Sequence, residues 1–166
     1  MEPEPTSFSE LYRRHAQDVF RFAFWLCGDA DDARDITSET FVRVWTSEQP
    51  IRELSVKAYL FTIARRLHLQ HRRRSVRRAP LTEDAAGTSR DTERSIEDRS
   101  ELEHVLRGMH ALPEQDRAIL IMHAAEELKH EEIAAAMGLS IAAVKVRIFR
   151  ARAKLSALVS SSRSPR

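Results

Sequence analysis

Cysteine, glycine and long apolar runs are scarce in this 166-residue chain. A single cysteine, Cys27, cannot form a disulfide within the chain, which excludes a disulfide-rich scaffold and fits a reducing compartment. Four glycines and no sustained alternation of apolar and polar residues leave little basis for a sheet. No apolar run approaches the roughly 20 residues of a membrane span, and no signal-peptide pattern is present. We therefore expect an all-α, cytoplasmic protein with no membrane insertion.

The sequence signatures of catalysis and of metal binding are also missing. The chain has no glycine-rich phosphate loop, no nucleophile elbow and no carboxylate pair in an acid–base setting. His68 and His71 lie three residues apart, but their neighbours are arginines, which repel a cation, and no cysteine accompanies them. We expect no enzyme activity, no metal site and no cofactor.

Charge is distributed unevenly along the chain, although the net charge is only +2. Residues 65–78 carry seven arginines and no acid, and residues 145–166 carry seven lysines or arginines and no acid. Two cationic segments suit two contacts with a polyanion. Residues 82–101 instead contain seven acids, three arginines and almost no large apolar side chain, which is typical of a solvated linker. We predict two small helical domains, residues 7–80 and 101–160, joined by a flexible acidic linker over residues 81–100.

Apolar residues at spacings of three and four predict helices in both domains. Ser7 and Glu10 form a capping box for the first helix, Gly28 follows its end, and Pro113 suits a helix start. Trp45 falls on the predicted buried side of the second helix. The predicted helices cover about residues 7–27, 31–47, 55–78, 96–109, 113–126, 131–137 and 141–158.

The last two of these helices have the pattern of a helix-turn-helix. Between them, Gly138 can take a left-handed C-cap and Ser140 can N-cap the longer second helix. A solvated bundle helix is the alternative for the basic residues alone, but the Gly138–Ser140 turn favours a helix that enters the major groove of DNA. The predicted buried stripe of the longer helix is Ile141, Val144, Ile148, Ala151, Leu155 and Leu158, and Lys145, Arg147, Arg150, Arg152 and Lys154 lie off it.

Two charged features of the N-terminal domain each admit more than one interpretation. Asp35 and Glu39 lie one helical turn apart, where like charges repel, and such an acidic ridge would suit a basic protein partner. Ordinary helix-start acids are the alternative. The arginines after Leu67 fit a phosphate-binding surface, a membrane-surface contact or a solvated helix end, and the helix-turn-helix favours nucleic acid.

Four stretches, in this order and spacing, resemble the extracytoplasmic-function (ECF) sigma factors, the small two-domain class of bacterial RNA polymerase initiation factor. Residues 35–45, Asp-Ile-Thr-Ser-Glu-Thr-Phe-Val-Arg-Val-Trp, resemble the core-polymerase-binding helix of that family. Residues 58–67 resemble the helix that melts and reads the minus-ten promoter element. Leu112 and Pro113 with Arg117, residues 132–134 and 138–140, and residues 144–152 resemble the minus-thirty-five domain.

The resemblance implies that the chain binds core RNA polymerase and promoter DNA and is restrained by an anti-sigma factor. It assigns core-polymerase binding to Asp35, Ser38, Glu39 and Arg43. It assigns minus-ten contacts to Tyr59, Arg65, Arg66, His68, Arg72, Arg73 and Arg74. It assigns minus-thirty-five contacts to Ser140, Ala143, Lys145, Arg147, Arg150 and Lys154.

Three residues depart from the usual family pattern: Ser38 replaces Gln, Arg66 replaces Asn, and Val146 replaces Ser or Thr. The first affects core docking, and the other two bear on promoter sequence. Thr37, Ser38 and Thr40 beside the acidic ridge also permit a phosphorylation hypothesis.

A free-standing helix-turn-helix regulator is the alternative function. Such a protein normally binds a palindrome as a symmetric dimer. The asymmetric two-domain pattern, with no obvious dimerisation helix, argues against it. Tight binding of the isolated protein to a palindrome, without polymerase, would favour it.

Overall fold

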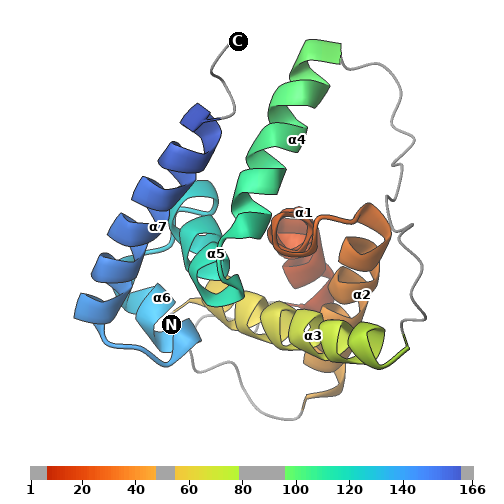
Figure 1. Cartoon of the computed structure of the whole chain (residues 1–166). Coiled ribbons are helices and arrows are strands. Elements are labelled where there is room, and N and C mark those ends of the chain that lie inside the picture. The colour runs from red at the N-terminus through yellow and green to blue at the C-terminus, as the bar shows by residue number, and fades with distance from the viewer. Residues whose placement is uncertain (1–6, 48–54, 79–95, 162–166) are drawn as a thin grey trace.

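The computed structural model describes residues 7–47, 55–78 and 96–161, which form helices and, within these ranges, no strand. Figure 1 shows two groups of helices packed side by side. The N-terminal group is α1 (Phe8–Cys27), α2 (Ala30–Thr46) and α3 (Val56–Arg78). The C-terminal group is α4 (Ile96–Ala111), α5 (Glu114–Leu120), the π-helix η1 (Ile121–Ala125), α6 (His130–Met137) and α7 (Ile141–Ser161). The predicted all-α class is confirmed for the described residues.

The N-terminal group forms a three-helix bundle around aromatic and branched apolar side chains. Phe22 of α1 stacks on Phe61 of α3, with ring centroids 4.5 Å apart. The predicted caps are present: Ser7 Oγ accepts a hydrogen bond from Glu10 N, and Gly28, with φ of 76°, ends α1. Asp29 Oδ1 caps α2 by accepting from Asp32 N, which fixes the turn between the first two helices.

The C-terminal group packs α4, α5 and α6 against α7, and η1 packs against α5 and α6. Ile119, Met122, Ile133 and Val144 are completely buried in this core. Gly138 takes the left-handed conformation at the end of α6, with φ of 66°, so the predicted helix-turn-helix geometry is present.

Three details differ from the sequence-based expectations. Trp45 is 66% exposed and Ile141 is 41% exposed, although both were predicted to be buried. The helix predicted over residues 113–126 changes to π-helical hydrogen bonding at Ile121, where Glu126 N donates to the carbonyl five residues earlier. Helix α4 begins at Ile96, as predicted for the helix over residues 96–109, and so takes in the end of the stretch predicted as linker; residues 81–95 of that stretch lie outside the described residues.

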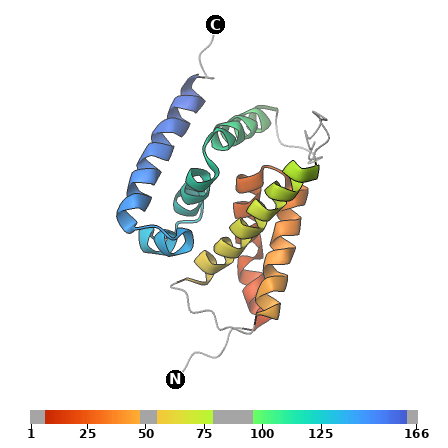
Figure 2. The ribbon, with the colours of Figure 1, turned by 60° about the horizontal axis from the view of Figure 1, so that its bottom comes forward.

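The two helix groups contact each other directly, as Figure 2 shows from a second direction. Helix α3 packs against α6, and α1 packs against α4, α5 and η1. Arg65 of α3 donates two hydrogen bonds of 2.8 Å to the Glu114 carboxylate of α5. A bidentate pair of this kind fixes orientation as well as distance, so the groups have a defined relative placement.

Candidate polymerase and nucleic-acid interface

The predicted polymerase-binding residues lie together on one face of α2. Asp35, Ser38 and Arg43 are exposed. Glu39 is half-buried, and its Oε1 lies 3.3 Å from His71 Nε2 of α3. The face therefore presents carboxylates to solvent, as a surface for a basic partner requires.

The neighbouring hydroxyls are not equally accessible. Thr37 and Thr40 are buried, and their hydroxyls donate to the carbonyl oxygens of Ala33 and Ile36 at 2.7 and 2.6 Å. Because both groups are enclosed and hydrogen-bonded within α2, they are poor substrates for a kinase in this fold. Ser38 is the exposed member of the predicted trio.

An exposed apolar patch lies beside the acidic ridge. Trp45 contacts Phe8 edge-on at 4.6 Å between ring centroids, and Tyr12 contacts Phe41 at 4.9 Å. Tyr12, Val42 and Trp45 are all exposed, although the sequence pattern predicted that Trp45 is buried. Exposed aromatic side chains next to charged groups are typical of a protein-binding surface.

The predicted minus-ten residues are only partly accessible. Arg66, Arg72, Arg73 and Arg74 are exposed along α3, and Tyr59 is half-buried. These four arginines form a cationic strip on the surface of α3, and several neighbouring cations favour contact with nucleic-acid phosphates.

Two members of the minus-ten set are engaged elsewhere. Arg65 is paired with Glu114 of the C-terminal group. His68 is 4% exposed, so the prediction that it projects with the arginines is wrong. Burial, followed by the charges of Arg117 and Arg72, lowers its pKa to about 4. His68 is therefore neutral near pH 7 and contributes no positive charge to the strip.

Most of the predicted minus-thirty-five residues line the outer face of α7. Lys145, Arg150 and Lys154 are exposed, and Ala143 is half-buried. Ser140 Oγ accepts a hydrogen bond of 3.1 Å from Ala143 N, so Ser140 caps the helix as predicted. Arg147 is held by Asp116 of α5, with Nη1 and Oδ1 3.0 Å apart.

Apolar side chains lie between the cations of α7. Phe149 is 77% exposed and Val146 is 47% exposed, and sequence patterning did not single out Phe149 as a functional residue. A shallow hollow of about 420 Å³ lies beside them, lined by Ala142, Val146 and Arg150 among others. Apolar groups on a recognition helix can contact thymine methyl groups.

A buried carboxylate joins the two helix groups. The Glu126 side chain is fully buried and accepts hydrogen bonds of 2.7 and 3.1 Å from Arg21 of α1. Lys57 of α3 lies 3.0 Å from Glu126 Oε2 and also donates to the Glu126 carbonyl oxygen. The hydrogen bond to Glu126 raises the pKa of Arg21. Glu127, the next residue, has a positive φ of 56°, which is uncommon outside glycine.

The described residues contain no group of three or more histidine, cysteine or acidic side chains suited to hold a metal ion. Burial raises the pKa of Cys27 to about 11, and its thiol donates to the Asp29 carbonyl, as expected for a structural cysteine. Within the same residues, no helix combines the length and apolarity needed to cross a bilayer.

Two family models match the chain. Sigma-70 region 2 matches residues 11–78, and the Sigma-70 region 4 family matches residues 102–155. These ranges coincide with the N-terminal group and with most of the C-terminal group.

Similar proteins extend the match over nearly the whole chain. The ECF RNA polymerase sigma factor SigE of Mycolicibacterium smegmatis is 33% identical over 90% of this chain, which spans 60% of SigE. The ECF RNA polymerase sigma factor SigM of Bacillus subtilis is 30% identical over 92% of this chain and 94% of SigM.

Two solved structures have a similar fold. CnrH in complex with the cytosolic domain of CnrY has a TM-score of 0.66 and 29% identity, covering 93% of this chain and 88% of CnrH. The sigma factor RpoE in complex with the anti-sigma factor NepR, from Bartonella quintana, has a TM-score of 0.72 and 22% identity. The match covers 94% of this chain and 98% of RpoE.

Proposed function

The chain belongs to the ECF sigma factors, which direct RNA polymerase to specific promoters, and we propose that three surfaces of the fold divide this work. The acidic ridge of α2 binds core polymerase, the arginine strip of α3 contacts the minus-ten element, and α7 contacts the minus-thirty-five element. Residues 7–80 and 101–160 act as the two functional domains. The family match together with the separate exposure of these three surfaces supports this assignment.

Core docking depends on the exposed carboxylate of Asp35 and on the aromatic patch beside it. Glu39 joins the contact after it leaves His71, and Ser38 and Arg43 border it. Charge complementarity then steers the encounter, and burial of Trp45 stabilises the complex.

Promoter contact is split between two helices. On α3, Arg66, Arg72, Arg73 and Arg74 track the phosphates of the melted strand, and Tyr59 supports an unstacked base. On α7, Arg150 contacts base edges, and Arg147 does so after it leaves Asp116, while Lys145 and Lys154 contact phosphates. Ser140 and Ala143 fix the end of α7 that enters the groove.

The two helix groups contact each other in the structure, and we infer that this closed arrangement limits promoter binding. Arg65 cannot contact DNA while it is paired with Glu114, and α3 is covered on one side by α6. We infer that core polymerase separates the two helix groups and fixes their spacing to match the promoter. Two weak DNA contacts on one tether then gain affinity through effective concentration.

An anti-sigma factor is the regulatory partner that we propose. CnrH and RpoE were each solved with a protein partner, the cytosolic domain of CnrY and the anti-sigma factor NepR. The exposed patch of Tyr12, Val42 and Trp45 is a surface that such a partner would cover in competition with polymerase.

Run-off transcription with core polymerase and genomic fragments tests the function directly. The wild-type chain is expected to start transcription at discrete promoters, and Asp35→Lys is expected to abolish both core pull-down and transcription while leaving the helical content unchanged. Asp31→Lys, another exposed acid on α2, is the matched control and should retain both activities. Undiminished core binding by Asp35→Lys would refute the docking assignment.

A further inference from the structure

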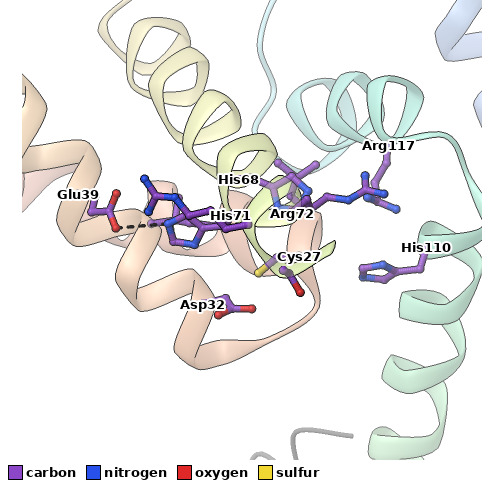
Figure 3. Close-up of a pocket in the computed structure, with 12 residues that line it drawn as sticks. Cys27, Asp32, Glu39, His68, His71, Arg72, His110 and Arg117 are labelled. Atoms are coloured by element: carbon purple, nitrogen blue, oxygen red, sulfur yellow. Dashed lines mark hydrogen bonds and ion pairs between the residues drawn. The ribbon is translucent and has the colours of Figure 1, made fainter. Parts of the chain in front are cut away.

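A cavity of about 540 Å³ lies at the seam between the two helix groups. Helices α1, α2, α3, α4 and α5 all contribute to its wall. Figure 3 shows that its polar groups separate into two ends. One end holds the Glu39–His71 pair, and the other holds His110 and Arg117, with Arg72 and His68 between them. The volume lies in the range of pockets that hold small molecules.

The end of the cavity with His110 and Arg117, here called the cationic end, contains a buried polar atom without a partner, and so does the neighbouring His68. Arg117 is 5% exposed, and its Nη1 makes only long contacts of 3.5 Å with the Met109 and Leu112 carbonyl oxygens. Arg117 Nε and His68 Nε2 have no hydrogen-bond partner among the described residues. An unsatisfied buried polar group is costly, so each of these atoms is a point at which a ligand would be stabilised.

The charges at this end also repel one another. After burial, the charge of Arg117 and then that of Arg72 lower the pKa of both His68 and His110. Arg72 in turn opposes the positive charge of Arg117, whose pKa is lowered by burial. Glu114 favours the Arg117 charge, but its two oxygens already accept hydrogen bonds from Arg65. The cavity wall also contains two acids, Asp32 and Glu39. Glu39 pairs with His71, and neither acid forms an ion pair with Arg72, His110 or Arg117.

We propose that this cavity binds a phosphate-bearing small molecule, with the phosphate between Arg72, His110 and Arg117. Guanidinium groups recognise phosphate through two parallel hydrogen bonds, and imidazole adds a further donor. At the opposite end of the cavity, the Glu39 carboxylate accepts hydrogen bonds from hydroxyl or amino groups elsewhere on the ligand. A cavity of this size has room for more than phosphate alone, so a sugar phosphate or a nucleotide matches its two ends.

The site depends on the closed arrangement because its residues come from both helix groups. Arg72 belongs to α3, whereas His110 and Arg117 belong to α4 and α5. A bound ligand therefore stabilises the closed arrangement. Ligand binding itself does not depend on the proposed function. Its consequence does: when the cavity is occupied, Arg72 contacts the ligand and cannot contact promoter DNA.

Isothermal titration of the full chain with inorganic pyrophosphate tests the site. We expect saturable binding with one site per chain, weakened at least about tenfold by His110→Gln or by Arg117→Lys. Arg107→Gln removes an exposed charge from the same helix as His110 and should leave the affinity unchanged. His110→Gln keeps the test decisive if Arg117→Lys fails to fold, since the His110 side chain is not part of the core.

Absence of saturable pyrophosphate binding, or equal weakening by Arg107→Gln, would overturn the proposal. So would a result in which His110→Gln weakens binding of a single-stranded oligonucleotide while the wild type ignores pyrophosphate, because the cations would then belong to the nucleic-acid surface. The titration needs no polymerase, so its failure leaves the run-off transcription result untouched.

Discussion

His68 shows where sequence patterning fails for a single residue. The apolar spacing on α3 runs through Leu60, Ala64 and Leu67 and then stops, which predicts that His68 projects with the arginines after it. The structure covers His68 because it faces the seam with the C-terminal group. Burial by a distant part of the chain leaves no local sequence signal, so this site residue could not be placed from sequence.

The buried imidazole predicts a pH dependence of stability. Unfolded histidine titrates near pH 6.5, whereas the pKa of His68 in the fold is about 4. Between these values the unfolded chain binds more protons, so the free energy of unfolding decreases as the pH falls from 6.5 towards 4. His15, His110 and His123, whose pKa values are also lowered, act in the same direction.

His68→Leu should therefore lose less stability on acidification than the wild type. Urea unfolding at pH 7.5 and pH 5 measures the difference for each protein. Part of the acid effect should survive in the variant because the other histidines remain. If the wild type and His68→Leu lost equal stability between pH 7.5 and pH 5, folding would not lower the pKa of His68.

Glu126 is a second residue whose importance comes from the tertiary structure. Its carboxylate is the common acceptor for Arg21 and Lys57, and it is fully buried. Glu126→Ala should lower the free energy of unfolding by about 1.5–3 kcal/mol, the usual contribution of a hydrogen bond to a charged group. Urea denaturation measures this loss, and the exposed Glu131→Ala is the matched control with little expected effect. Equal stability of the two variants would contradict the role of Glu126.

Among the elements, α7 was predicted well and η1 was not. The Gly138–Ser140 turn has a local physical cause, a left-handed cap followed by a hydroxyl cap, and such signals are readable from sequence. The π-helical turn has no comparable signal, since Ile121–Ala125 contains residues that also suit an α-helix. It immediately precedes Glu126, whose contacts lie far away in the chain, so the change of helical register depends on tertiary packing.

Ser140 has a capping role and a proposed DNA-binding role, and substitution can separate the two. Ser140→Ala removes the hydroxyl that accepts from Ala143 N and should cost about 1 kcal/mol of stability. Ser140→Asp should retain the cap and the stability but weaken promoter binding, because a carboxylate repels DNA phosphates. Thermal unfolding and DNA binding by the polymerase complex measure the two effects. Equal DNA affinity of Ser140→Asp and wild type would remove Ser140 from the interface.

For the whole molecule, the sequence predicted two helical units and their cationic segments but not how the units pack. The contacts that join them, Arg21 with Glu126 and Arg65 with Glu114, link residues 105 and 49 positions apart. Charged residues are 31% of the chain, so composition offers many equally plausible pairs. A flexible acidic linker suggested separate units, whereas the structure gives them a shared seam and a cavity.

The closed arrangement predicts that loss of both joining carboxylates opens the molecule. In the Glu114→Ala, Glu126→Ala double variant, Arg65, Arg21 and Lys57 lose their carboxylate partners across the seam. The radius of gyration should therefore rise above the value of about 15 Å for a compact chain of this length. Small-angle X-ray scattering measures the opening.

Because opening also frees Arg65, the same double variant should bind a single-stranded minus-ten oligonucleotide more tightly than the wild type, most clearly at low salt. Adding Arg65→Gln should cancel the gain in DNA affinity but not the expansion, which separates release of this side chain from general loosening. If the double variant expands yet binds the oligonucleotide no better, then neither the pairing of Arg65 with Glu114 nor the packing of α6 on α3 limits binding to this element.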